Sequence, residues 1–211
     1  MSVRFRSPVR PLLPFACALL FAAQAAIAAE TPSKASAATD KAKAEADAAM
    51  AAMMKEAAPG PMHALLNPLV GKWKTSVKTY MGPEPTVSEG TCERVLIMGG
   101  RFLQSKYTGD FAGMPFEGME ILGYDNALKQ FRSVWVDNMG TTLTIGVNGQ
   151  ADASGKVITV NSMMDDPATK KPLPVKMVTK IVDQNTNTFV MTCSKDGKEI
   201  KQMEMTYTRA Q

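Results

Sequence analysis

Histidine is almost absent from this chain of 211 residues, in which His63 is the only one. One imidazole, lying before the predicted strands, excludes a Ser-His-Asp arrangement inside the fold and a metal site built from several histidines. We therefore expect no metal ion or other cofactor. For His63, a hydrogen bond within its own turn is favoured over ligation of a single metal or a haem iron.

Cysteine is scarce as well, with three in the whole sequence. Cys17 falls in the N-terminal apolar segment, which leaves Cys92 and Cys193 for the folded part. Their predicted strands lie three spacings apart around a barrel wall, roughly 14 Å, which exceeds the reach of a disulfide. Two buried free thiols are favoured over a disulfide, which would need both side chains to point inward across a narrow interior.

The chain carries little net charge when its N-terminal 29 residues are left out of the count. Residues 1–29 are typical of a signal peptide, because three arginines are followed by an apolar run from Leu12 to Ala28. This run is too short and too interrupted to span a membrane. Cleavage after Ala28 or Ala29 removes those arginines and no acidic residue, so the formal net charge falls from +4 to +1. We expect a periplasmic or secreted protein without a nucleic-acid partner.

Aromatic residues are absent from residues 30–61, and β-branched residues are absent from this segment after Thr39. This segment, rich in Ala, Lys and Glu, cannot build a core alone, so we interpret it as a linker or a loosely docked helix. The helix is predicted from about Lys41 to Ala57, with Asp40 as its N-cap and Pro59 beyond its end.

Methionine, in contrast, is abundant. Met50, Met53, Met54 and Met62, together with His63, resemble the thioether-rich tracts that bind Cu(I) in exported proteins. Most of the methionines lie in the predicted strands, however, which favours a general role in filling a core and lining a pocket.

No helical period long enough for a crossover occurs in residues 62–211. Alternating apolar and polar residues are interrupted by turn residues every ten to fifteen positions, and nine such turns predict ten strands. The clearest strand, Leu173 to Asp183, places Val175, Met177 and Ile181 on one face. Consecutive antiparallel strands must avoid free edges, so we predict an all-β, up-and-down antiparallel barrel of about ten strands.

The first strand opens with Gly71-Lys72-Trp73, which resembles the G-x-W signature of lipocalins and related calycin barrels. In a barrel with an even number of strands the last strand ends where the first begins, so Arg209 should lie over Trp73. We expect these two residues, with the turn that contains His63, to form a structural plug at one end.

A wider likeness covers nearly the whole chain after the leader. It is carried by the segments AAMMKEAAPG, HALLNPLVGKW, EGT, MGGRFLQSKY, GMPFEG, LGYDN, VWVDNM and MEMTYTR. These segments resemble the uncharacterised bacterial family "domain of unknown function 1579". The resemblance implies a calycin-like barrel, often exported, and carries no catalytic residues over to this chain.

Two carboxylates draw attention in the hairpin PFEGMEILGYDNALKQFRSVWVDNM. A five-residue turn centred on Ala127 would place Glu117 opposite Asp137 and Met119 opposite Trp135, with both rows pointing into the barrel. The opposite face would then carry Glu120 and Arg132 as a solvated outer pair, because burying such a pair is costly.

The inward row predicts where a ligand would bind. Glu117 and Asp137 would lie at the mouth opposite the plug and select a polar or cationic head group. The walls of the site would be Met119, Phe131, Trp135 and Met177. Gln104 could donate a hydrogen bond to a ligand carbonyl if its side chain points inward.

The leading hypothesis is an exported barrel that binds a small, partly apolar or amphiphilic molecule, with no catalytic residue assigned. One alternative is an enzyme in which Glu117 and Asp137 perform acid-base chemistry. The others are an interaction protein with a filled barrel, and a rim whose carboxylates are simply hydrated.

Overall fold

The computed structural model describes residues 32–82, 84–166 and 169–211. The predicted signal peptide, residues 1–29, lies outside the described residues. Two compact units divide the chain, residues 1–48 and residues 49–211. Helix α1 (Pro32–Glu56) belongs to both units and begins earlier than the predicted start at Lys41. None of the described helices is long and apolar enough to cross a membrane.

The end of α1 belongs to the second unit and is held within that unit through backbone carbonyls. The Asn126 side chain donates hydrogen bonds to the carbonyl oxygens of Glu56 and Ala58, at 2.6 and 3.0 Å. The Arg101 guanidinium donates one to the carbonyl oxygen of Ala57 at 3.0 Å. The methionines of this helix contribute nothing to the core, because Met50, Met53 and Met54 are each more than half exposed.

Ten strands follow two short helical segments in the second unit. Their bounds are α2 (Pro61–Ala64), η1 (Asn67–Leu69), β1 (Gly71–Thr79), β2 (Thr86–Ile97), η2 (Met98–Gly100), β3 (Phe102–Phe111), β4 (Met114–Asp125), β5 (Gln130–Asp137), β6 (Thr144–Ala151), β7 (Val157–Asp165), β8 (Pro172–Ile181), β9 (Thr186–Lys195) and β10 (Lys198–Arg209).

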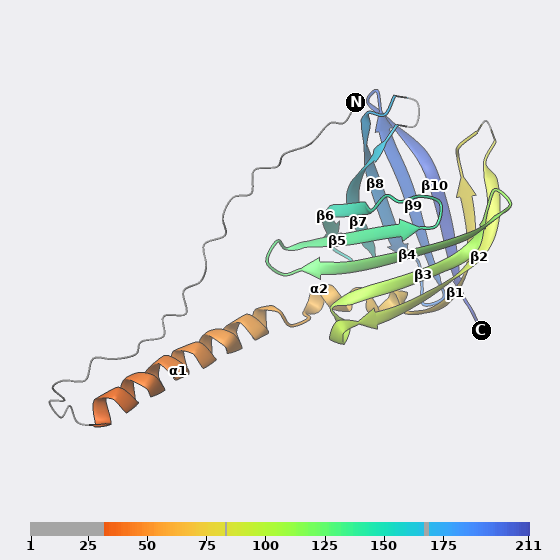
Figure 1. Ribbon diagram of the computed structural model, residues 1–211. Coiled ribbons are helices and arrows are strands. Elements are labelled where there is room, and N and C mark those ends of the chain that lie inside the picture. The colour runs from red at the N-terminus through yellow and green to blue at the C-terminus, as the bar shows by residue number, and fades with distance from the viewer. Residues whose placement is uncertain (1–31, 83, 167–168) are drawn as a thin grey trace, which may run out of the picture. The chain divides into compact units, whose positions relative to one another are not determined.

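The strands form one closed barrel in which neighbours in sequence are neighbours in space and β1 pairs with β10 (Figure 1). All the pairs are antiparallel, so the predicted up-and-down barrel of about ten strands is confirmed. Closure gives every strand two partners and leaves no free edge.

Residues 61–70 cover the end of the barrel at which β1 begins and β10 ends, which we call the plug end. Leu66 and Leu69 are at most 1 % exposed and pack into one cluster with buried residues of β3, β4, β5 and β7. The opposite end, where β5 ends and β6 begins, is called the mouth.

Trp73 and Arg209 meet at the plug end, as the strand directions led us to expect. They are directly paired between β1 and β10, and the guanidinium carbon lies 4.2 Å from the centre of the indole ring. Arg209 also donates hydrogen bonds to the carbonyl oxygens of Val70 and Gln184, at 3.0 and 2.9 Å. Gly71, at φ 135°, leaves room for the guanidinium, since any Cβ there would overlap it.

Two smaller expectations also agree with the structure. Cys92 and Cys193 are buried and free, as predicted from their strand positions. His63 is 5 % exposed, its Nδ1 accepts a hydrogen bond from the amide of Gly60 at 3.0 Å, and its ring lies edge-on to Tyr124.

Candidate functional site

The β4–β5 hairpin differs from its prediction by one residue. Asp137 pairs with Gly118, and Trp135 pairs with Glu120. The predicted facing pair of Glu117 and Asp137 is therefore wrong. Because side chains alternate along a strand, this shift reverses every side chain of β4 relative to the prediction.

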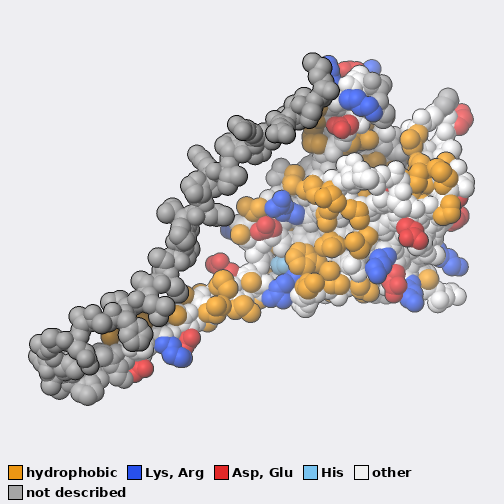
Figure 2. Space-filling view, viewed as in Figure 1, with side chains coloured by type: hydrophobic (Ala, Val, Ile, Leu, Met, Phe, Trp, Pro, Cys, Tyr) orange, Lys and Arg blue, Asp and Glu red, His pale blue; other side chains and the backbone are white. Residues whose placement is uncertain are grey.

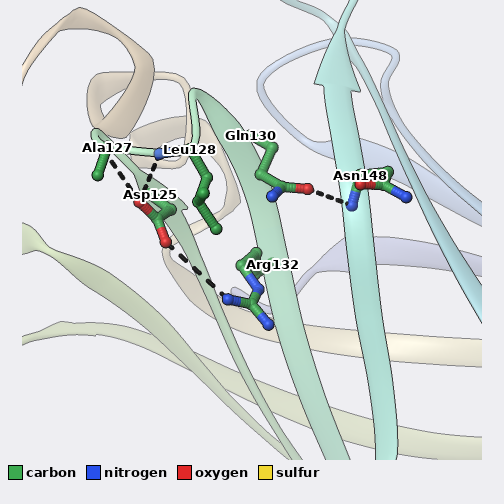
Figure 3. A network of polar contacts seen from close by, with 6 residues as sticks. All are labelled: Asp125, Ala127, Leu128, Gln130, Arg132 and Asn148. Carbon is green, nitrogen blue, oxygen red and sulfur yellow. Dashed lines mark hydrogen bonds and ion pairs between the residues drawn. The ribbon is translucent and has the colours of Figure 1, made fainter.

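The turn explains the shift (Figure 3). One oxygen of the Asp125 carboxylate accepts hydrogen bonds from the amides of Ala127 and Leu128, at 3.0 and 2.9 Å. Lys129 adopts a left-handed conformation at φ 52°, and Asp125 pairs with Gln130. Four residues thus form the turn where five were expected, because the Asp125 side chain replaces a backbone acceptor.

Several predicted site residues consequently lie outside the barrel. Glu117 is exposed and Met119 lies on the same outer row. Gln104, whose direction the sequence left open, also points outward and donates a hydrogen bond to the Met119 sulfur at 3.5 Å. The predicted outer pair of Glu120 and Arg132 is wrong too, since Arg132 lies 4.0 Å from Asp125 and Glu120 points inward.

Four of the predicted residues do lie on inward rows, although at different depths. Phe131 is fully buried at the plug end, so it belongs to the core there. Met177 packs against the same cluster and is only half-buried. Trp135 and Asp137 lie nearer the mouth, where the indole N–H donates to the Asp137 carboxylate at 2.7 Å.

A band of polar side chains crosses the middle of the interior. One row of cross-strand pairs joins Arg94 to Ser105 and Ser105 to Glu120 across β2, β3 and β4. A second row crosses β1, β10 and β9. We call the whole set the polar band: Thr75, Arg94, Ser105, Glu120, Ser133, Asn187 and Tyr207.

Arg94 is the centre of this band. Its side chain is 5 % exposed, donates a hydrogen bond to the Asn187 amide oxygen at 2.8 Å, and lies 4.0 Å from the centre of the Tyr207 ring. In the described part of the chain Arg94 forms no ion pair with a carboxylate. The direct contacts of this buried positive charge are thus an amide oxygen and an aromatic ring.

Several polar atoms of the band lack hydrogen-bond partners among the described residues. They are Thr75 Oγ1, Arg94 Nε, Ser105 Oγ and Asn187 Nδ2. Each of these four side chains is at most 5 % exposed. An unpartnered buried donor or acceptor costs about 1–3 kcal/mol, and such atoms are few in native proteins. These four atoms come from inward rows of β1, β2, β3 and β9.

Burial also changes the titration of the band. It raises the pKa of Glu120 above its ordinary value of 4.5, and the nearby Arg94 and Ser133 oppose this shift only in part. Burial raises the pKa of the Cys92 thiol and of the Tyr207 hydroxyl as well, so both stay neutral near pH 7.

Replacing Glu120 with glutamine is expected to change how stability depends on pH. The native protein holds the Glu120 proton more tightly than the unfolded chain does, so its free energy of unfolding falls as pH rises above about 4.5. That loss is absent in the variant, and its size is about 1.4 kcal/mol for each unit of pKa difference.

Urea denaturation from pH 4 to pH 8 measures this effect. The stability of the wild type relative to Glu120→Gln should decrease with rising pH and then level off. Glu117→Gln is the matched control, because it removes an exposed carboxylate from the outer row of the same strand. A relative stability that increases with pH would contradict the inward position of Glu120.

The inward side chains between the polar band and the mouth are mainly aromatic or sulfur-containing. Phe116, Trp135, Phe189, Met191 and Met203 all lie on inward rows, yet each is only half-buried. Phe116 and Trp135 stack with their ring centres 6.3 Å apart. These half-buried side chains pack against buried residues of the same half, such as Val77 and Tyr107.

Gly118 allows Trp135 to lie flat against β4. A Cβ at this position would overlap the six-membered part of the indole ring. Gly118→Ala should therefore displace the indole, break its bond to Asp137 and lower the free energy of unfolding by about 1–3 kcal/mol. Tryptophan fluorescence and chemical denaturation measure both effects. Gly140→Ala is the control, since no atom lies closer than 4.0 Å to its Cβ; equal effects of the two changes would contradict the expected overlap.

The outer face of the barrel also carries apolar side chains. Figure 2 shows them gathered over β4, β5 and β6 on the viewed face. A groove of about 740 Å³ is lined mainly by outward residues of β6 to β9, among them Ile145 and Met163, with Lys176 and Glu199 paired at its edge. It also reaches the buried residues Ser162 and Val175. Both faces of several strands are thus partly apolar.

No three His, Cys, Asp or Glu side chains within the described residues converge to form a possible metal site. The interior presents the hydrogen-bonding groups of the polar band, the carboxylates of Glu120 and Asp137, and the apolar side chains of the mouth half.

Comparison with known proteins supports the fold and gives no activity. No curated protein matches the chain. The crystal structure of Rv2717c from M. tuberculosis is similar with a TM-score of 0.50 and 16 % identity, over 73 % of this chain and 100 % of that one. A redesigned β-barrel matches with a TM-score of 0.36 and 17 % identity, over 71 % and 96 % of the two chains. The model of the family described as "Protein of unknown function (DUF1579)" matches residues 58–209, so the chain belongs to this family.

Proposed function

We propose that this protein binds a small, largely apolar molecule inside the mouth half of its barrel. The observation that carries the proposal is the group of aromatic and thioether side chains that face the interior of the mouth half and stay half-buried. Inward residues of the plug end, such as Phe131 and Leu103, are at most 1 % exposed. Inward residues of the mouth half, such as Trp135 and Met191, remain half-buried although they face the inside.

The lining chemistry also supports a ligand with an apolar body. Aromatic rings and flexible thioethers adapt to varied apolar shapes, and pockets for small molecules combine such walls with a few polar groups. The polar band beneath this half supplies those groups. The enzyme alternative loses the feature on which it rested, because Glu117 and Asp137 do not face each other.

An exported location is part of the same proposal. It rests on the leader-like composition of residues 1–29 and on the near-neutral charge that remains after them. A binding protein in the periplasm or outside the cell would have access to small amphiphilic molecules in that compartment. N-terminal sequencing of protein recovered from a bacterial periplasm tests this part directly. The chain should begin at Ala29 or Glu30, and a chain that still begins at Met1 would contradict export with cleavage.

Native mass spectrometry with three twelve-carbon probes tests the binding function. Dodecanoate, dodecanol and dodecylamine share one tail, and at least one of them should bind in a 1:1 complex. If none of the three binds the folded protein at micromolar concentrations, the proposed function is wrong.

A pair of matched variants locates the site. Met191→Trp fills part of the mouth half, whereas Met163→Trp makes the same change on the outer face, where Met163 is 54 % exposed. The inner change should weaken probe binding by about tenfold or more, equivalent to 1.4 kcal/mol, and the outer change should leave it unaltered. The reverse pattern would assign binding to the outer groove.

A further inference from the structure

Two unpartnered atoms of the polar band can act only as hydrogen-bond donors. Arg94 Nε carries a hydrogen and has no partner among the described residues. Asn187 uses its amide oxygen to accept from Arg94, because a guanidinium can only donate. Its Nδ2 group must therefore point elsewhere, and it too has no partner. Both donors thus lack a hydrogen-bond partner among the described residues, although the Arg94 guanidinium lies close enough to the Cys92 thiol to lower its pKa.

Two hydroxyl groups complete the unpartnered set. Ser105 Oγ and Thr75 Oγ1 are buried and make no hydrogen bond of good geometry, although Thr75 lies close enough to the Tyr107 hydroxyl to lower its pKa. A hydroxyl can turn to donate to whatever acceptor is present. Ser105 lies directly beside Arg94 in the cross-strand row. The band thus offers two obligate donors and two adaptable ones within one layer of the barrel.

The buried guanidinium of Arg94 favours an anion beside it. Arg94 is positive and forms no ion pair among the described residues. The titratable groups that face it are Glu120 on β4, Cys92 on its own strand and Tyr207 on β10. Burial raises the pKa of all three groups, while Arg94 lowers the pKa of each, and none of the three forms an ion pair with Arg94 among the described residues.

We propose, on the basis of the binding function above, that the polar band holds an anionic, oxygen-bearing head group of the ligand, of which a carboxylate is the smallest example. Arg94 Nε and Asn187 Nδ2 donate to its oxygens, and Ser105 and Thr75 complete the contacts. The apolar tail extends from the band past Trp135 and Met191 to the mouth. This assigns the head group to the middle of the barrel and reverses the cationic preference expected from a carboxylate pair at the rim.

The test compares head groups on one tail in the wild-type protein. Isothermal titration calorimetry gives dissociation constants for dodecanoate, dodecanol and dodecylamine at pH 7.5. Dodecanoate should bind at least tenfold more tightly than either of the others. Equal constants for the three probes would overturn the head-group proposal and leave the binding function intact, because ordered water would then occupy the band. Preference for the amine or the alcohol would overturn it as well.

Variants identify the residues responsible. Arg94→Met keeps a long apolar side chain and removes the charge, so it should abolish the preference for dodecanoate while dodecanol binding changes less than threefold. Asn187→Leu should reduce the preference in the same direction. Lys176→Gln is the matched control, since it removes an exposed cation beside the outer groove and should leave the preference unchanged.

Each outcome separates the two proposals. Failure of every probe to bind the wild type would overturn the binding function and the head-group proposal together. Loss of the preference in Lys176→Gln, with the preference kept in Arg94→Met, would overturn the head-group proposal alone. The wild-type comparison stands even where an inner variant fails to fold.

Discussion

Replacing Phe131 with alanine is expected to lower the free energy of unfolding by about 3–5 kcal/mol. Phe131 is fully buried at the plug end, where it belongs to the cluster that contains Leu66 and Leu69. Its ring also meets Tyr124 edge-on at a centroid distance of 5.1 Å. The surrounding residues cannot readily close the cavity that alanine would leave, because the cluster joins four strands to the segment that covers the barrel end.

Urea denaturation followed by circular dichroism measures this loss. Phe102→Ala is the matched control, because Phe102 lies near the same end but on the outer face and is 38 % exposed. Its removal should cost clearly less. Similar losses for the two phenylalanines would contradict the assignment of the inner and outer rows.

Replacing Arg209 with alanine is expected to lower the free energy of unfolding by about 2–4 kcal/mol, since it removes charge-assisted hydrogen bonds and a cation–π contact together. Arg209 joins three parts of the chain. It reaches Val70 before β1 and Gln184 before β9, and its guanidinium covers Trp73. Its loss therefore loosens the closure between the first and last strands.

Arg209→Lys separates charge from geometry. A lysine keeps the charge but lacks the planar fork that reaches two carbonyl groups while it stacks on an indole. The lysine variant should recover less than half of the lost stability, as measured by thermal and urea denaturation. Full recovery would mean that the charge alone, without the planar contact to Trp73, stabilises the plug end.

The architecture could be predicted from the sequence because it depends on repeated local signals. Turn residues recur at regular intervals from Gly82 to Gly197, and alternation in β8 is clean, with Val175 inside and Lys180 outside. Strand direction then placed Arg209 beside Trp73. Each of these inferences used many residues or a simple geometric rule, so no single misjudged residue could reverse it.

The direction of β4 could not be predicted in the same way. Both of its rows contain apolar residues and one or more carboxylates, so burial alone does not distinguish them. The register depended on one turn, and the Asp125 side chain shortened that turn by one residue. The Asp-Asn sequence that opens it was the available signal, because Asp at this position commonly accepts from the amides that follow.

The polar band was missed for a different reason. Glu120 was placed outside because a buried ion pair with Arg132 would be costly. Its actual neighbours, Arg94 and Ser105, come from strands that precede it, and Asn187 comes from a strand that follows much later. Such a cluster depends on the registers of most strands at once, which the spacing of residues within one strand does not specify.

Methionine methyl NMR spectra of the full chain, recorded during a titration with dodecanoate, test the central claim most directly. Met177, Met191 and Met203 lie on inward rows, whereas Met119 and Met163 lie on the outer face. A ligand inside the mouth half should shift the methyl signals of the inward group and leave those of the outer group in place. Shifts confined to Met119 and Met163, or none at saturating dodecanoate, would contradict a ligand inside the barrel.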